Sequence, residues 1–134
     1  MDFSQINYWA VLVAALAAMG IGWIWYSPAL FGKIWMRVNG FSGNEPRGNM
    51  ARTMIIAFIL SLIMSLNLAA FLAVPGTNIR WGITAGFLAG FGWVTLSIVV
   101  ISLFERRPFA YMAVNGGYWV VSFIVMGAIL GAWR

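Results

Sequence analysis

Residues 53–79 read TMIIAFILSLIMSLNLAAFLAVPGTNI, 27 consecutive positions without a charged side chain. Three similar runs accompany it, so that 107 of the 134 residues lie in uncharged stretches covering 3–32, 53–79, 81–104 and 108–133. A helix needs about 20 apolar residues, each rising ~1.5 Å, to cross the hydrocarbon of a bilayer. Each run is therefore long enough for one span and too short for two spans with a turn between them.

The four runs predict an all-α, polytopic integral membrane protein with one membrane domain over residues 1–134. The expected spans cover about 6–26, 51–74, 81–103 and 109–133, joined by turn-forming segments. Only 8% of the residues are charged, against roughly 25% in soluble domains, which excludes a soluble globular domain. The uninterrupted runs also exclude an outer-membrane barrel, whose strands alternate apolar and polar residues.

The chain contains no histidine and no cysteine, and its acids are Asp2, Glu45 and Glu105, each in a terminus or a loop. These absences exclude a histidine general base, a thiol nucleophile and the usual zinc or haem ligands. We therefore expect no enzyme activity, no cofactor and no metal. The formal charge of +5 is typical of basic loops beside a membrane, so we expect no nucleic-acid partner.

A short amphipathic helix is expected at about residues 28–38, between the first two spans. Its apolar residues fall within about 140° of one another at ~100° per residue, with its basic residues to one side. Such a helix lies in the membrane surface on the cytoplasmic side; the alternative is a lid or re-entrant gate over a cavity. The residues that define this segment are Ser27, Pro28, Phe31, Lys33, Trp35 and Arg37. Among them, Ser27 is expected to cap the helix and Pro28 to take its first position.

The basic residues predict the orientation of the chain in the membrane. Six fall on one expected side: Lys33, Arg37, Arg47, Arg52, Arg106 and Arg107. The other side holds two, Arg80 and Arg134. Because basic loops stay in the cytoplasm, we expect loops 27–52 and 104–108 to be cytoplasmic and both termini to lie outside.

Small residues spaced by four recur in every expected span. They include Ala14, Ala18, Gly22, Ser61, Ser65, Gly82, Gly86, Gly90, Gly127 and Gly131. Helices in lipid gain little from packing leucine against leucine, so close approach depends on such residues. These stripes predict the faces on which the helices pack within the bundle or between subunits.

Two spans also carry a polar or aromatic face. On the fourth span, one face away from the small stripe gathers Asn115, Tyr118, Trp119, Ser122 and Met126. On the third, Thr84, Thr95 and Ser102 fall within about 20° of one another, opposite the glycine stripe. Trp93 and Trp119 lie near mid-membrane depth, and Asn67 needs a partner of its own. Such faces either bond to neighbouring helices or form a polar seam that conducts or binds a small solute.

Four segments carry a resemblance to a known family. They are INYWAVLVAA at 6–15, WYSPALFGKIWM at 25–36, AVNGGY at 113–118 and MGAILGAW at 126–133. Together they resemble the small four-span membrane proteins grouped as domain of unknown function 1761, over essentially the whole chain. The resemblance implies an integral membrane protein of a bacterial inner membrane and brings no catalytic or ligand-binding residues.

Two kinds of function remain open. The first is a passive transporter or channel for an unidentified small-molecule substrate, built as a homo-oligomer because four helices leave little room for a private pore. Since no span holds an acid or a base, such transport would not be coupled through an intramembrane carboxylate. The second is a non-transporting partner subunit, assembly factor or lipid-organising protein whose basic loops face anionic headgroups.

Overall fold

The computed structural model describes residues 1–46 and 48–134, and the described part contains helices and no strand. Its elements are η1 (Phe3–Gln5), α1 (Tyr8–Trp25), α2 (Gly32–Val38), α3 (Met50–Leu72), α4 (Ile79–Ala89), η2 (Gly90–Thr95), α5 (Leu96–Phe104) and α6 (Phe109–Ala132). Within residues 1–46 and 48–134, four helices are long and apolar enough to cross a membrane: α1, α3, the continuous helix over 79–104, and α6. The predicted fold class and its four spans are confirmed. Arg47, one of the basic residues used for orientation, lies outside the described residues.

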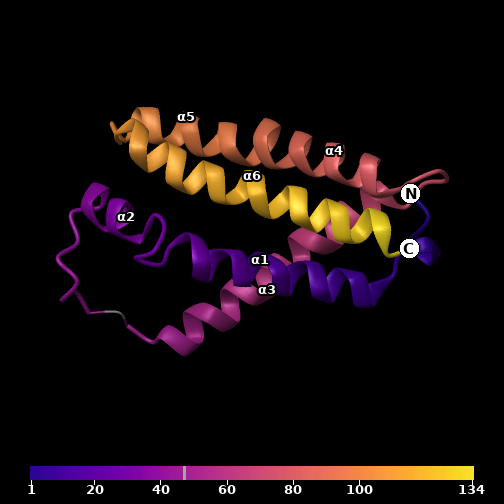
Figure 1. Ribbon diagram of the computed structural model, residues 1–134, viewed down its shortest axis with the longest axis horizontal. Coiled ribbons are helices and arrows are strands. Elements are labelled where there is room, and N and C mark those ends of the chain that lie inside the picture. The colour runs from indigo at the N-terminus through magenta and orange to yellow at the C-terminus, as the bar shows by residue number, and fades with distance from the viewer. Residues whose placement is uncertain (47) are drawn as a thin grey trace.

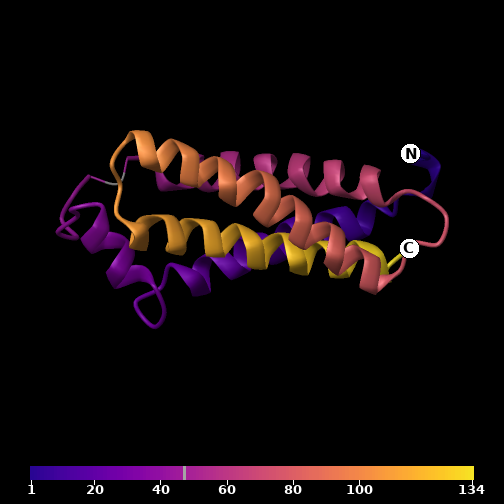
Figure 2. The same cartoon turned by 90° about the horizontal axis from the view of Figure 1, so that it is seen from above.

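The helices run up and down, so that both termini and the 73–78 turn lie at one end of the bundle (Figure 1). The opposite end carries α2, the loop after it and the 105–108 turn, and we refer to it as the α2 end. Helix α6 is the centre of the arrangement because it packs against both α4 and α1. Helix α3 packs mainly on α1 and makes few contacts with α4 (Figure 2).

Three of the spans have an asparagine as the N-cap of their helix. The Oδ1 atom of Asn7 accepts a hydrogen bond from the backbone N–H of Trp9 at 3.1 Å, at the start of α1. Asn49 and Asn78 cap α3 and α4 in the same way, accepting from the N–H groups of Arg52 and Trp81. Each cap satisfies an N–H that has no partner inside its helix, and so marks where the helix begins.

Helices α4 and α6 approach each other at their glycines. A Cβ atom built on Gly82 would lie 2.0 Å from the carbonyl oxygen of Gly127, and one built on Gly86 would lie 2.1 Å from that of Phe123. No side chain fits there, so the backbones touch directly. The glycine stripe predicted on the third span thus lies against α6, and Gly90, Gly127 and Gly131 belong to the same contact.

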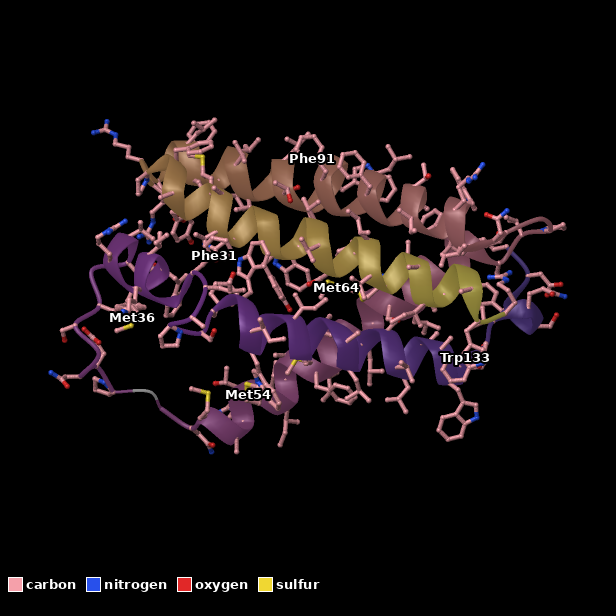
Figure 3. The ribbon with its side chains drawn as sticks, in the orientation of Figure 1. Phe31, Met36, Met54, Met64, Phe91 and Trp133 are labelled. Atoms are coloured by element: carbon pink, nitrogen blue, oxygen red, sulfur yellow. The ribbon has the colours of Figure 1, made fainter. Side chains whose placement is uncertain are left out.

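The predicted serine stripe of α3 lies against α1, and the predicted alanine stripe of α1 is buried inside the bundle. Ala14 and Ala18 are fully buried on α1, and Ser65 is fully buried on α3. The hydroxyl of Ser65 donates to the carbonyl oxygen of Val11 at 2.9 Å, which links the two helices. Figure 3 shows Met64 among the helices, while Phe91 points away from the bundle.

The π-helical segment η2 corrects one prediction. Thr84, Thr95 and Ser102 do not share a face: Thr95 and Ser102 are buried, whereas Thr84 is exposed and donates to the carbonyl oxygen of Arg80 in its own helix. A π-turn contains an extra residue, so every later side chain is rotated by about 100°. This rotation brings Thr95 to the glycine side of the helix, where its hydroxyl donates to the carbonyl oxygen of Gly116 at 2.9 Å.

The second correction concerns the amphipathic helix, which begins at Gly32 rather than near residue 28. Residues 26–31 form a turn instead, and the hydroxyl of Ser27 donates back to the carbonyl oxygen of Ile24 rather than capping α2. The turn is so tight that a Cβ on Gly32 would lie 2.4 Å from the carbonyl oxygen of Tyr26. Pro28 therefore lies in the turn and not in the first position of a helix.

Candidate functional site

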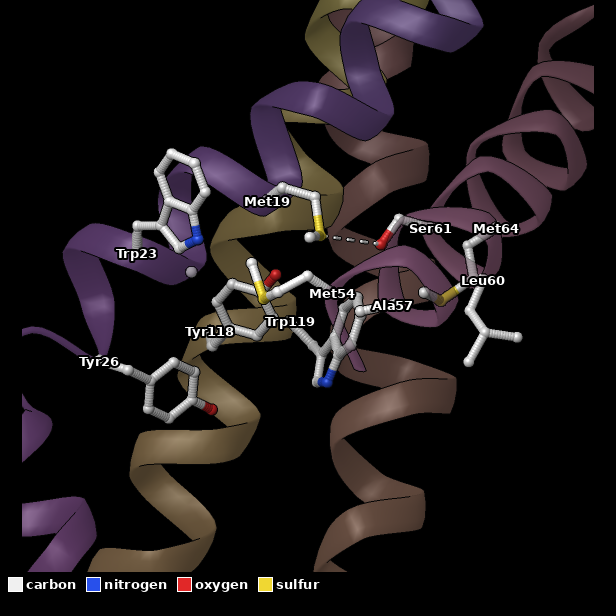
Figure 4. Close-up of a pocket in the computed structure, with 11 residues that line it drawn as sticks. Met19, Trp23, Tyr26, Met54, Ala57, Leu60, Ser61, Met64, Tyr118 and Trp119 are labelled. Carbon is white, nitrogen blue, oxygen red and sulfur yellow. Dashed lines mark hydrogen bonds between the residues drawn. The ribbon is translucent and has the colours of Figure 1, made fainter. Parts of the chain in front are cut away.

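A cavity of about 360 Å³ opens between α1, α3 and α6 in the half of the bundle near the α2 end (Figure 4). It exists because α1 and α3 approach each other toward the end with the termini and diverge toward this one (Figure 2). We call it the α1/α3/α6 groove. It is lined by Met19, Gly22, Trp23, Tyr26, Met54, Ala57, Leu60, Ser61, Met64, Tyr118 and Trp119.

The walls of the groove are apolar and adaptable. Methionine contributes three of the side chains, one from α1 and two from α3, and unbranched thioethers fit ligands of varied shape. Trp119 contributes a large apolar surface from α6 (Figure 4). Trp23 and Leu60 stand at the rim with 69% and 53% of their surfaces exposed, so the groove opens sideways, out of the bundle.

The hydroxyl groups of the groove are already used in bonds between helices. Tyr118 Oη donates to the carbonyl oxygen of Ala18 at 2.7 Å, and Tyr26 Oη donates to Asn115 Oδ1 at 2.7 Å. Ser61 Oγ lies 4.0 Å from the sulfur of Met19, as the dashed line in Figure 4 marks. A ligand in the groove would therefore meet mainly carbon and sulfur, and the indole N–H groups of Trp23 and Trp119 are the side-chain donors that remain beside it.

Two residues of the predicted polar face of α6, Asn115 and Tyr118, bond to Tyr26 and to Ala18 of α1 respectively. The indole N–H of Trp25 donates to the carbonyl oxygen of Val114 at 2.8 Å. Ser122 is fully buried, and its hydroxyl has no hydrogen-bond partner among the described residues. Trp119 turns into the groove.

The predicted site residues of the third span lie elsewhere. Trp93 is 64% exposed on the side that faces α3, with its ring 6.1 Å from that of Phe71. Thr84 is exposed on α4, and Thr95 is buried against α6. The structure therefore brings Tyr118 and Trp119 together and separates them from Thr84 and Trp93, so these residues do not line one continuous path.

Aromatic stacking fastens the turn and α2 to the end of α1. The rings of Trp25 and Phe31 are 4.6 Å apart, and Trp35 packs on the edge of Tyr26 at 5.8 Å. Lys33 and Arg37, on the same helix, are exposed. Helix α2, which carries these two cations, is thereby joined through Trp35 to Tyr26, a residue of the groove wall.

The α2 end is electropositive. The described cations there are Lys33, Arg37, Arg52, Arg106 and Arg107. Glu105 lies 3.5 Å from Arg107, whose guanidinium stands 5.0 Å above the ring of Tyr111. The backbone N–H groups of Ser42 and Gly43 donate to Glu45, and these bonds lower the pKa of its carboxyl group to about 2.

The methionines of the groove were not singled out from the sequence. Met19, Met54 and Met64 appear there as ordinary apolar residues, because a cavity depends on the angle between helices and not on a local pattern. Gly22 and Ser61 were predicted as packing residues, and both also border the groove. A useful signal would have been methionine on both α1 and α3, two spans whose small residues face each other.

The comparison with protein families matches residues 9–131 to a family described as Protein of unknown function (DUF1761). No curated protein and no solved structure matches the chain.

Proposed function

The chain belongs to the DUF1761 family, and we propose that it is a small, non-transporting membrane protein that holds an acyl chain of an anionic lipid in the α1/α3/α6 groove. The observation that carries this proposal is a sideways-opening, methionine-lined cavity whose neighbouring hydroxyls are used between helices. Its volume of about 360 Å³ falls in the range of small-ligand pockets, roughly 300–1,000 Å³. A hydrocarbon chain matches these walls because it neither donates nor accepts hydrogen bonds.

The charge at the α2 end supports an anionic headgroup. Lys33, Arg37 and Arg52 are exposed there, in the half of the bundle that contains the groove. A lipid whose acyl chain enters the groove would place its phosphate near this end. Each basic residue close to an anionic headgroup contributes about 1 kcal/mol, which favours an anionic lipid over a zwitterionic one.

The proposal includes a location and an orientation. The excess of basic residues in loops 27–52 and 104–108 supports a cytoplasmic α2 end, with both termini outside a bacterial inner membrane. The groove then opens into the cytoplasmic leaflet. The proposal involves no catalysis, because the sequence offers no histidine, no cysteine and no pair of acids within a span.

Native mass spectrometry of the delipidated protein, titrated with an anionic and a zwitterionic phospholipid of equal chain length, tests the proposal. We expect one anionic lipid to be retained more strongly than the rest. Ala57→Trp should abolish that retention by filling the groove, whereas Leu16→Trp, at an exposed position of α1 outside the groove, should leave it intact. Equal retention in both variants would refute the proposal.

The headgroup is tested separately. Neutralising Lys33 and Arg52 together, as Lys33→Gln and Arg52→Gln, should reduce the preference for the anionic lipid by about 30-fold, the equivalent of about 2 kcal/mol. The zwitterionic lipid should bind as before, since the groove is unchanged. An unaltered preference would show that charge at the α2 end does not select the lipid.

A homo-oligomeric passive transporter for a small solute is the second candidate. The observation that favours it is a set of exposed polar side chains within the spans, namely Asn67, Thr84 and Ser97, which assembly could gather around a shared path. The hydroxyls of Thr84 and Ser97 already bond to their own helix, at the carbonyl oxygens of Arg80 and Trp93. Liposomes containing the protein distinguish the two functions: the transporter requires solute leakage, and lipid binding alone predicts none.

A partner subunit or assembly factor is compatible with lipid binding, because the groove takes up only part of the exposed apolar surface of the spans. Crosslinking in cells tests this possibility. Recovery of one reproducible partner protein would support it, whereas recovery of self-contacts alone would count against it.

A further inference from the structure

Asn67 is an exposed amide inside a membrane span. It lies five residues before the end of α3, roughly 8 Å from that end at ~1.5 Å per residue. No hydrogen bond joins its side chain to any of residues 1–46 or 48–134. A primary amide without a partner is costly in hydrocarbon, so something outside this chain must satisfy it.

The surface around Asn67 is apolar and unpacked. One turn away on either side, Ile63 is 51% exposed and Phe71 is 53% exposed. Leu60, one further turn along the same stripe, is 53% exposed. The spacing from Leu60 through Ile63 to Asn67 is three and then four residues, which is the spacing of a seam between two packed helices.

The same surface borders hollows between α3 and the α4–η2 helix. A cavity of about 200 Å³ is lined by Asn67, Phe71 and Trp93, among others, and a neighbouring one of about 380 Å³ reaches Trp81. These hollows exist because α3 makes few contacts with α4 (Figure 2). We call Leu60, Ile63, Asn67, Phe71 and Trp93 the Asn67 face.

We propose that the Asn67 face is the interface of a homodimer, in which the Asn67 side chains of two copies bond to each other across a two-fold axis. A carboxamide both donates and accepts, so one copy supplies what the other lacks: Nδ2–H of each donates to Oδ1 of the other. Two copies inserted in the same orientation bring their α3 helices together as parallel neighbours, with Asn67 at the same depth in both.

A lipid is a poorer occupant of this face. Acyl chains cover Ile63 and Phe71 but offer nothing to the amide, and lipid ester groups offer acceptors without donors. The α1/α3/α6 groove differs in this respect, because its hydroxyls are already bonded. The two surfaces share only Leu60, at their common edge, and they suit different occupants, a second copy at one and a lipid chain at the other.

Cysteine crosslinking in native membranes tests the interface directly, since the chain has no cysteine and each variant carries a single thiol. Asn67 stays in place, and the thiol is introduced as Ile63→Cys or Phe71→Cys. The control is Val13→Cys on α1, which is also exposed and lies five residues from the same end of the bundle. Mild oxidation should give a disulfide-linked dimer from at least one α3 variant and none from the control. Equal yields from all three variants would overturn the proposal.

The amide itself is tested by Asn67→Leu, which keeps the size of the side chain and removes its hydrogen bonds. In lipid nanodiscs, counting subunits by single-molecule photobleaching should show dimers for the native chain and about tenfold weaker association for the variant. Lipid retention in the α1/α3/α6 groove should be unchanged, which separates this proposal from the previous one. A native chain that is monomeric at all densities, or a variant that associates as well as the native chain, would overturn the proposed role of Asn67.

Discussion

The substitution Gly82→Ala probes the contact between α4 and α6 most severely. The added Cβ would lie 2.0 Å from the carbonyl oxygen of Gly127, whereas ordinary contact begins at 3.4 Å. The helices must separate locally by roughly 1.4 Å, the difference of those two distances, because a backbone carbonyl cannot rotate away. Even a 0.5–1 Å gap forfeits about a quarter to a half of each dispersion contact.

We expect this clash to cost about 3 kcal/mol, at the upper end of overpacking effects. The higher helix propensity of alanine stabilises the folded state by about 1 kcal/mol relative to glycine. The net decrease in the free energy of unfolding is therefore about 2 kcal/mol. The matched control is Gly20→Ala in α1, where a Cβ meets no atom within 4 Å. The control should be neutral or more stable by up to about 1 kcal/mol.

Unfolding in mixed micelles with increasing SDS, followed by circular dichroism, measures both variants. Gly82→Ala and Gly127→Ala should each destabilise, and the double variant should lose less than the sum, because one separation of the helices accommodates both methyl groups. Gly82→Ala with native stability would refute the direct backbone contact.

Three further predictions concern single interactions. Thr95→Val should lower the free energy of unfolding by about 1–2 kcal/mol, because it removes the hydroxyl that donates to the Gly116 carbonyl and keeps the shape of the side chain. The same SDS titration measures this change. Native stability of the variant would contradict the orientation of Thr95 toward α6 that follows from the π-turn. Asn78→Ala should cost about 1 kcal/mol by removing the cap of α4, and Asn78→Asp, which preserves an acceptor, should restore most of the loss. The carboxyl of Glu45 should titrate near pH 2 by NMR, against 4.5 in the unfolded chain. Because its pKa is lowered by folding, the bonds it accepts from Ser42 and Gly43 should persist above pH 4.5 and be lost as the pH falls toward 2; a midpoint near 4.5 in the folded protein would contradict this turn.

Charge and hydropathy were sufficient to predict the four spans. Residues 53–79 hold no charged side chain, and a helix of this length and composition is stable across a membrane. Helix α3 occupies Met50–Leu72, so each of its ends lies within two residues of the predicted span at 51–74. The residues at which α4 meets α6 belong to the glycine stripes of the sequence, because close approach in lipid requires small residues; the stripes alone did not indicate which helices would meet.

The interior of the third span was not predictable from periodicity. A calculation at 100° per residue assumes one helix type, and the π-turn at Gly90–Thr95 breaks that assumption in the middle of the span. The tight turn before α2 was not predicted from the sequence for a related reason. Ser27 and Pro28 are good helix starters, but their turn closes onto Gly32 through a contact that local preference does not encode.

The candidate site was less predictable than the fold. Tyr118 and Trp119 were identified from the polar and aromatic face of α6, yet their partners Met19 and Met54 were not. The groove arises from the divergence of α1 and α3, which depends on how Ser65, Val11 and their neighbours pack at the other end of the pair. Interhelical angles are a property of the whole bundle.

The central claim is that the α1/α3/α6 groove holds a lipid chain. Its most direct test is an anionic phospholipid with a photoactivatable group midway along one acyl chain, reconstituted with the protein, illuminated and mapped by mass spectrometry of peptides. We predict labels concentrated on the segments that contain Met19, Trp23 and Met54, and loss of those labels in Ala57→Trp. Labels spread evenly over the exposed side chains of all four spans, and unchanged in Ala57→Trp, would contradict the claim.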